Sequence, residues 1–221
     1  MRQDRFSAIA CACAFAWAAP CPSLQAAELA ALVRDQGGAP VSDAVIVAVP
    51  VDGVIKPPAR QPHEVVDQID REFVPRVTVV LAGTSVTFPN KDNVRHHVYS
   101  FSPAKKFELP LYAGTPAAPV VFDKPGLVVL GCNIHDWMVG YIYVSESPYF
   151  ARTGSDGRAL LRDLPERSYT VRVWHPQLEG AEPAARADLN RAGRTELAWV
   201  LKLKPEFRSH RIAPGRGTGR Y

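Results

Sequence analysis

The chain has 221 residues, of which 47% are hydrophobic and 22% charged, and its formal net charge is +4. Six Lys or Arg residues against one Glu lie in residues 202–221, so the rest of the chain is close to neutral. A basic excess confined to the last twenty residues argues against a nucleic-acid-binding protein, whose basic residues form a patch along the binding face.

The first 26 residues are typical of a secretory signal peptide. Arg2 and Arg5 precede an apolar stretch at 6–19, and Ala26 is the small residue before the predicted cut. The apolar stretch is shorter than the roughly twenty residues that a membrane-spanning helix needs. We therefore expect residues 1–26 to be removed on export to the periplasm, and we expect no membrane span.

Cleavage would leave one cysteine. Cys11, Cys13 and Cys21 leave with the signal peptide, and Cys132 remains. A lone thiol in an oxidising compartment is buried and inert, paired with another chain, or chemically active. Metal ligation is the commonest form of the last alternative.

Short runs rich in Val and aromatic residues recur along the rest of the chain, separated by Pro, Gly, Asn and Asp. Such runs predict β-strands, and no stretch has the apolar period of an ordinary amphipathic helix. We therefore predict an all-β protein of the sandwich type. The predicted strands include 44–49, 77–81, 86–88, 97–101, 127–130, 141–144, 169–174 and 197–203.

The sharpest motif is a C-x2-H-x2-M loop between two predicted strands. Cys132, His135 and Met138 bring a thiolate, an imidazole and a thioether to one short turn. These donors together favour copper in both of its oxidation states. Zinc is the chemical rival, but structural zinc sites usually draw four Cys or His ligands, often as C-x2-C pairs. The chain after residue 26 contains no such pair.

A second imidazole is expected from residues 90–98, Asn-Lys-Asp-Asn-Val-Arg-His-His-Val. Residues two apart on a strand share a face, so His96 lies with Val98 and His97 lies with Tyr99. Alternation therefore directs one of the two histidines toward the core, but it does not decide whether His96 or His97 is the ligand.

Residues 64–147 resemble the cupredoxin family. The likeness is carried by Phe-Val-Pro at 73–75, the Gly turn at 82–84, the N-x-D…H-x-V segment at 90–98 and the C-x2-H-x2-M loop. The resemblance implies a cupredoxin Greek-key β-sandwich that holds one copper ion.

The same resemblance implies the ligands. The family's ligand histidine is followed by a polar residue and then an inward Val, which implies His96 rather than His97. The implied set is His96, Cys132, His135 and Met138, with His97 as the alternative to His96. Met138 would be the weak axial ligand.

Amicyanin and pseudoazurin share this loop, and the likeness implies that the ring edge of His135 reaches the surface. Ile134, Trp137 and Pro110 are then candidates for an apolar docking patch, although Trp137 is equally suited to packing between domains.

The flanks resemble a smaller carboxypeptidase-regulatory-like β-sandwich. Residues 33–44 look like its opening strands, and residues 155–171 look like its closing strands. Neither flank is a whole domain, and each alone would leave sheet edges unpaired.

We therefore predict that residues 28–60 and 148–204 form one discontinuous sandwich into which the copper domain, 64–147, is inserted. A simple tandem of domains is the alternative. Residues 205–221 are predicted to be a disordered basic tail.

The stretches at 96–101 and 132–138 also resemble exported proteins labelled methylamine utilization proteins. This label implies a periplasmic one-electron carrier whose partner is a redox protein such as a dehydrogenase or a c-type cytochrome. A copper-binding or delivery protein is one alternative, and a non-redox adhesion or binding sandwich is another. No nucleophile–base pair has a recognisable spacing, so we predict that the protein is not an enzyme.

Overall fold

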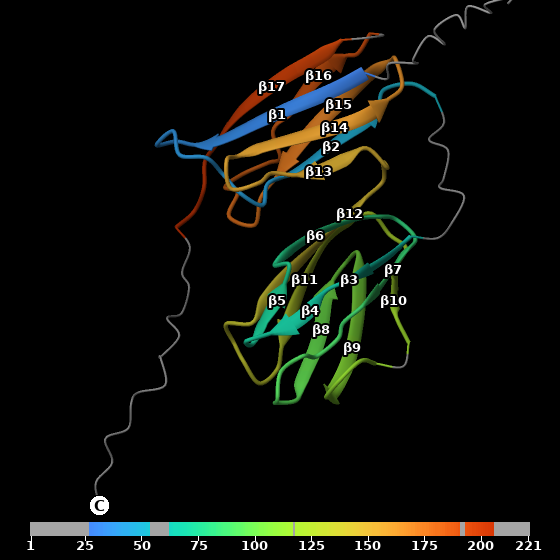
Figure 1. Cartoon of the computed structure of the whole chain (residues 1–221), viewed down its shortest axis with the longest axis vertical. Helices are drawn as coiled ribbons and strands as arrows, with labels where there is room; N and C mark the ends of the chain where they lie inside the picture. Colours follow the sequence, from blue (N-terminus) through green and yellow to red (C-terminus); the bar gives the residue numbers. More distant parts are fainter. Residues whose placement is uncertain (1–26, 54–61, 117, 191–192, 206–221) are drawn as a thin grey trace, which may run out of the picture.

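The structure is a computed structural model that describes residues 27–53, 62–116, 118–190 and 193–205. These residues form seventeen β-strands and no helix (Figure 1), which confirms the all-β prediction. The described residues accordingly include no helix with the length and apolar character that crossing a membrane requires. The predicted signal peptide and residues 206–221 of the predicted tail lie outside the described residues.

The strands fall into two groups along the chain. Ten lie in the middle: β3 (His63–Val65), β4 (Asp67–Ile69), β5 (Glu72–Val74), β6 (Val77–Leu81), β7 (Thr84–Thr87), β8 (His96–Ser102), β9 (Lys105–Tyr112), β10 (Val120–Phe122), β11 (Gly126–Cys132) and β12 (Val139–Ser145). Seven flank them: β1 (Ala27–Asp35), β2 (Val45–Pro50), β13 (Phe150–Arg152), β14 (Arg158–Leu164), β15 (Ser168–Trp174), β16 (Ala184–Asp188) and β17 (Arg194–Leu201).

The middle group is a sandwich around one apolar core. Five strands pair in the order β6-β12-β11-β8-β9 and three in the order β10-β7-β3, while β4 and β5 form a separate hairpin. Alternate residues point inward, as the period of two along a strand requires. The buried core contains Val98 and Leu130, and Cys132 and Met138 belong to the same cluster.

The flanking group has its own core. Its strands pair in the orders β14-β1-β17 and β13-β2-β15-β16. β1 runs antiparallel to β14 and parallel to β17, and β2 lies between β13 and β15. Main-chain hydrogen bonds therefore join strands that precede residue 51 to strands that follow residue 149.

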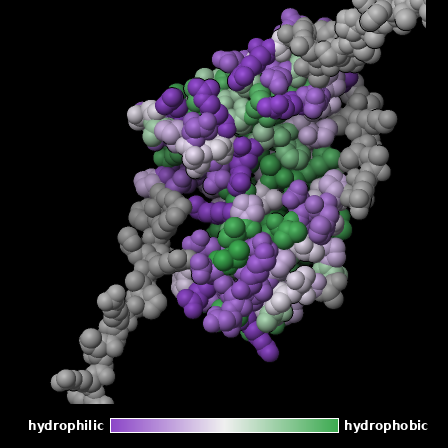
Figure 2. Space-filling model, viewed as in Figure 1, coloured by the Kyte–Doolittle hydropathy of each residue, from purple (hydrophilic) through white to green (hydrophobic). Residues whose placement is uncertain are grey.

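A small apolar cluster connects the two groups, which lie one above the other in Figure 1. The ring centroid of Trp174 lies 5.6 Å from that of Tyr143 and 5.8 Å from that of Tyr141. Arg152 adds a polar contact, because its Nη1 donates to the carbonyl of Val77 at 2.9 Å. Hydrophobic side chains are visible at the level where the groups meet in Figure 2.

Tyr169 anchors the start of β15. Its ring is fully buried and its hydroxyl donates to the carbonyl oxygen of Pro165 at 2.8 Å, a contact that recurs in sandwich folds as a tyrosine corner. Burial, and to a lesser degree Tyr149, raises the pKa of Tyr169 to about 12. The hydroxyl therefore stays protonated at neutral pH, and its contribution to stability is lost as the pH rises from the ordinary tyrosine pKa of 10.0 to about 12.

Tyr169→Phe should lower the free energy of unfolding by about 1 kcal/mol, because the ring is kept while one hydrogen bond is lost. Urea unfolding at neutral pH measures the change. An unchanged midpoint and slope would show that the hydroxyl contributes nothing.

Candidate metal centre

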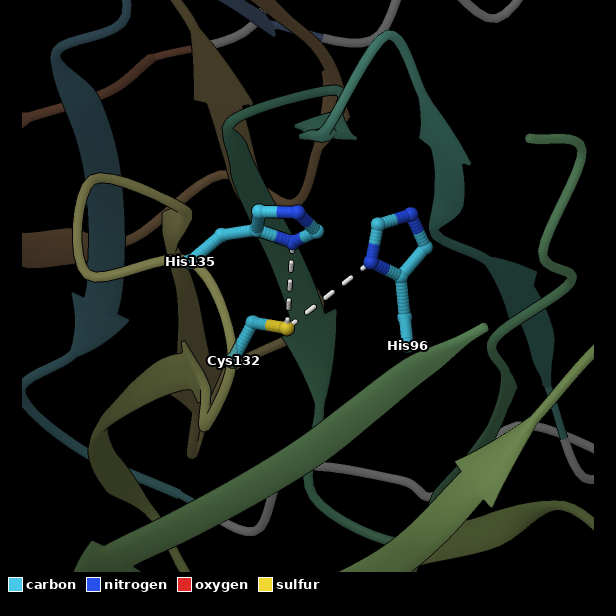
Figure 3. A group of neighbouring side chains, drawn as sticks. All are labelled: His96, Cys132 and His135. Atoms are coloured by element: carbon cyan, nitrogen blue, oxygen red, sulfur yellow. Dashed lines mark hydrogen bonds between the residues drawn. The ribbon is translucent and has the colours of Figure 1, made fainter. Parts of the chain in front are cut away.

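Three side chains that could hold a metal ion converge at one end of the middle sandwich (Figure 3). The Sγ of Cys132 lies 3.7 Å from Nδ1 of His135 and 3.8 Å from Nδ1 of His96. One donor atom from each residue lies within 4.8 Å of the other two. Cys132 and His96 are buried, and His135 is half-buried. The three donor atoms are therefore close enough together to hold one metal ion.

Strand pairing positions the first two donors. Cys132 ends β11 and pairs with Val98 of the antiparallel neighbour β8, whose first residue is His96. His96 and Val98 share a face, so the imidazole lies beside the thiol although 36 positions separate the two residues.

The turn between β11 and β12 positions the third donor. The backbone N–H of Met138 donates to the carbonyl oxygen of His135 at 2.9 Å, which closes the turn. This bond returns the chain to the core within three residues. Met138 is buried in the same cluster as Cys132, so its thioether lies on the core side of the loop.

Alternation along β8 separates the two neighbouring histidines. His96 is fully buried, whereas the Nε2 of His97 lies 3.0 Å from Oε1 of Glu108, a largely exposed side chain on β9. The ring of His97 also contacts Tyr99 edge-on. The structure therefore groups His96 with Cys132 and His135 and directs His97 to the other face of the sheet.

The second nitrogen of His96 is also engaged. Its Nε2 lies 2.7 Å from Oδ2 of Asp92. Burial raises the pKa of Asp92, but hydrogen bonds from His96 and from two backbone N–H groups outweigh this effect and lower the pKa below its usual value. The carboxylate is therefore ionised at neutral pH and accepts the hydrogen bond from His96.

His135 forms the outer edge of the centre. Its ring lies 5.2 Å from that of Trp137, and Trp137 and Ile134 are both about half exposed, at 47% and 48%. Burial, and then electrostatic interactions with His96 and Arg71, lower the pKa of His135. A lowered pKa keeps the imidazole neutral at neutral pH, so that its lone pair is available to a metal.

Pro110, the third residue predicted for the docking patch, is exposed on the edge strand β9, where Tyr112 pairs with His96 and Leu109 pairs with Val98. Lys105 pairs with Asp123 at 3.1 Å at the turn between β8 and β9, the opposite end of that hairpin from His96.

The donors fit a copper ion. A metal bonded to sulfur at about 2.3 Å and to nitrogen at about 2.0–2.1 Å spans sulfur and nitrogen donors that are about 3.5–3.8 Å apart in tetrahedral to trigonal geometry. The distances of 3.7 and 3.8 Å match this range. Two imidazoles and a thiolate with a nearby thioether are the donor types of mononuclear electron-transfer copper sites.

The sequence did not predict how the β4–β5 hairpin contributes to the centre. The backbone N–H groups of Asp70 and Arg71, between β4 and β5, bind the carboxylate of Asp92. Asp92 was recognised as part of a motif, but nothing in the sequence indicates which main-chain groups it meets.

No protein-family model and no curated protein matches the sequence. Among solved structures, a copper-containing nitrite reductase from Thermus scotoductus SA-01 is 29% identical over 44% of this chain, with a TM-score of 0.36. The chain covers only 25% of that enzyme.

Two smaller proteins are also similar. A mutant of amicyanin in its oxidised state is 24% identical over 37% of this chain and 80% of its own, with a TM-score of 0.33. A purple cupredoxin from Nitrosopumilus maritimus is 24% identical over 38% of this chain and 100% of its own, also at 0.33. These TM-scores lie below 0.5, so we derive the function from the donor geometry.

The two histidines can be distinguished by substitution. Loss of a residue that only hydrogen-bonds to a metal ligand typically weakens metal binding by about 10- to 100-fold. His96→Ala removes a direct donor and should weaken copper binding by more than this. His97→Ala is the matched control and should leave copper affinity unchanged, because the His97 ring contacts Glu108 and Tyr99 on the other face of the sheet. Competition titration with a copper chelator measures both, and the opposite pattern would transfer the ligand role to His97.

Proposed function

We propose that the protein is a one-electron carrier in which His96, Cys132, His135 and Met138 hold one type 1-like copper ion. The observation that supports this most directly is that two imidazole nitrogens face one buried thiol sulfur at 3.7 and 3.8 Å. Bound copper would supply a one-electron couple that these soft and borderline donors accept in both states.

The chain's own part is to hold the donors still. Cys132 and His96 lie on paired strands of a packed sandwich, and a main-chain hydrogen bond closes the loop that carries His135. Donors fixed in this way need little rearrangement when the charge at the centre changes.

We propose that electrons pass between the copper ion and a partner protein through His135. It is the half-buried member of the group, and exposed apolar side chains at Ile134 and Trp137 adjoin it. A partner that docks on this surface would approach the ring of a ligand. We propose a periplasmic redox protein such as a dehydrogenase or a c-type cytochrome as that partner, in keeping with an exported protein of the methylamine-utilization type.

We also propose the two-domain organisation. Residues 28–60 with 148–204 would form one discontinuous carboxypeptidase-regulatory-like sandwich, and residues 64–147 the inserted copper domain. The pairing of β1 and β2 with strands after residue 149, and the two separate cores, support this division. Domain termini often lie close together, which makes such insertions tolerable.

Cys132→Ser tests the proposed function. The wild-type protein with added Cu(II) should show an intense visible thiolate-to-copper band that ascorbate bleaches reversibly, and the variant should lack this band because a hydroxyl is a hard, weak donor.

The matched control is Ser100→Ala, which removes a hydroxyl from a buried position on β8 and should keep the band. A wild-type protein without the band, or one that passes its copper to a metal-free acceptor without redox cycling, would contradict the carrier function and favour copper delivery.

Met138→Leu should retain copper and raise the reduction potential. The substitution nearly conserves volume, so the fold should lose less than about 1.5 kcal/mol. Leucine has no lone pair, and a wholly apolar neighbour favours the copper state of lower charge. Voltammetry of the copper-loaded variant measures the shift, and an unchanged potential would remove Met138 from the proposed ligands.

A further inference from the structure

Asp92 connects the buried histidine of the centre to the β4–β5 hairpin. Its Oδ1 accepts the backbone N–H of Asp70 at 2.6 Å, and its Oδ2 accepts that of Arg71 at 2.9 Å. The same Oδ2 lies 2.7 Å from Nε2 of His96. The side chain of Asp92 is 12% exposed and that of His96 is completely buried, so this contact is shielded from solvent.

The hairpin is built to hold an anion at this point. Asp70 and Arg71 have φ values of 55° and 62°, the left-handed conformation of a tight hairpin turn. Successive N–H groups in such turns point to one side and form a concave site for an anion. The carboxylate of Asp92 fills that site, so the hairpin fixes the direction from which the charge meets His96.

The hairpin is itself fixed to the sandwich. The backbone N–H of Gln68 donates to the carbonyl oxygen of Pro89, and the N–H of Lys91 donates to that of Gln68. On the other strand, Phe73 packs so closely on Gly140 that a Cβ at Gly140 would lie 2.9 Å from the Cβ of Phe73. The hairpin that binds Asp92 is therefore fixed to the sandwich along both of its strands.

The chemistry of the pair sets the tautomer of His96. Both oxygens of the Asp92 carboxylate accept backbone N–H groups, so they act as acceptors, and the contact with Oδ2 places the proton of His96 on Nε2. The other nitrogen, Nδ1, then presents its lone pair, and this atom faces the Sγ of Cys132 at 3.8 Å. A carboxylate on the far nitrogen also makes an imidazole a stronger donor.

We infer that Asp92 is a positioning residue of the metal centre: held by the hairpin N–H groups, its carboxylate keeps His96 in the Nε2-protonated tautomer and favours the oxidised state of a bound copper ion. The first part concerns the protein without metal. The second rests on the proposed function, because the negative charge interacts more strongly with Cu(II) than with Cu(I).

The tautomer is tested in the metal-free full-length protein by ¹⁵N NMR of the histidine rings. We expect a protonated Nε2 in a strong hydrogen bond and an unprotonated Nδ1 for His96. Protonation at Nδ1 in the wild-type protein would overturn the inference, whether or not the protein binds copper and whether or not any variant folds.

Asp92→Asn tests the effect on copper. Its amide cannot accept from His96 and both backbone groups at once, so copper affinity should fall by about 10- to 100-fold. We expect the affinity for Cu(II) to fall more than the affinity for Cu(I). Each tenfold difference between the two losses of affinity raises the reduction potential by about 59 mV.

Asp123→Asn is the matched control. It removes the same charge from an exposed ion pair near the far end of β8, and it should change neither copper affinity nor potential. Equal potentials for the two variants, in a wild-type protein that shows the thiolate band, would overturn the role of Asp92 and leave the carrier function intact. A wild-type protein without the band would instead contradict the proposed function, and the NMR result would still decide the tautomer.

Discussion

The centre depends on the antiparallel pairing of β11 with β8. Cys132 pairs with Val98, and this register brings the thiol next to the imidazole of His96. The preceding residue, Gly131, pairs with Tyr99. Its missing side chain leaves room for the tyrosine ring, because a Cβ at Gly131 would lie 2.7 Å from that ring. A register shift of one residue would turn His96 away from Cys132, since side chains alternate between the two faces.

The centre has a closed side and an open side. On the closed side, completely buried His96 has both ring nitrogens engaged, one toward Cys132 and one with Asp92. A buried ring with an unpaired N–H would cost free energy, so the hairpin that holds Asp92 also makes this burial tolerable. On the open side, His135 reaches a surface with exposed Trp137. Among the described residues, the donors are therefore buried on the side of His96 and reach the surface at His135.

The flanking strands contact the same sheet that carries the centre. Trp174 packs on Tyr141 and Tyr143 of β12, the strand that begins directly after Met138. Farther along the sheet, Phe101 of β8 is 75% exposed. The junction therefore covers the sheet near β6 and β12, and the aromatic contacts support the strand that receives the metal loop.

The sequence by itself determined the structural class and the set of chemical donors. All eight predicted strand runs overlap observed strands, because alternation and β-branched residues act over a few neighbouring positions. Several observed strands, among them β9 and β16, were not predicted. In β9, Pro110 and a lysine pair weaken the strand pattern, as an edge strand permits. The parallel pairing of β1 with β17, the histidine that faces Cys132 and the partners of Asp92 were decided by the tertiary structure. These contacts join residues far apart along the chain, and the partners of Asp92 are backbone N–H groups that every residue except proline has, so only the folded arrangement selects them.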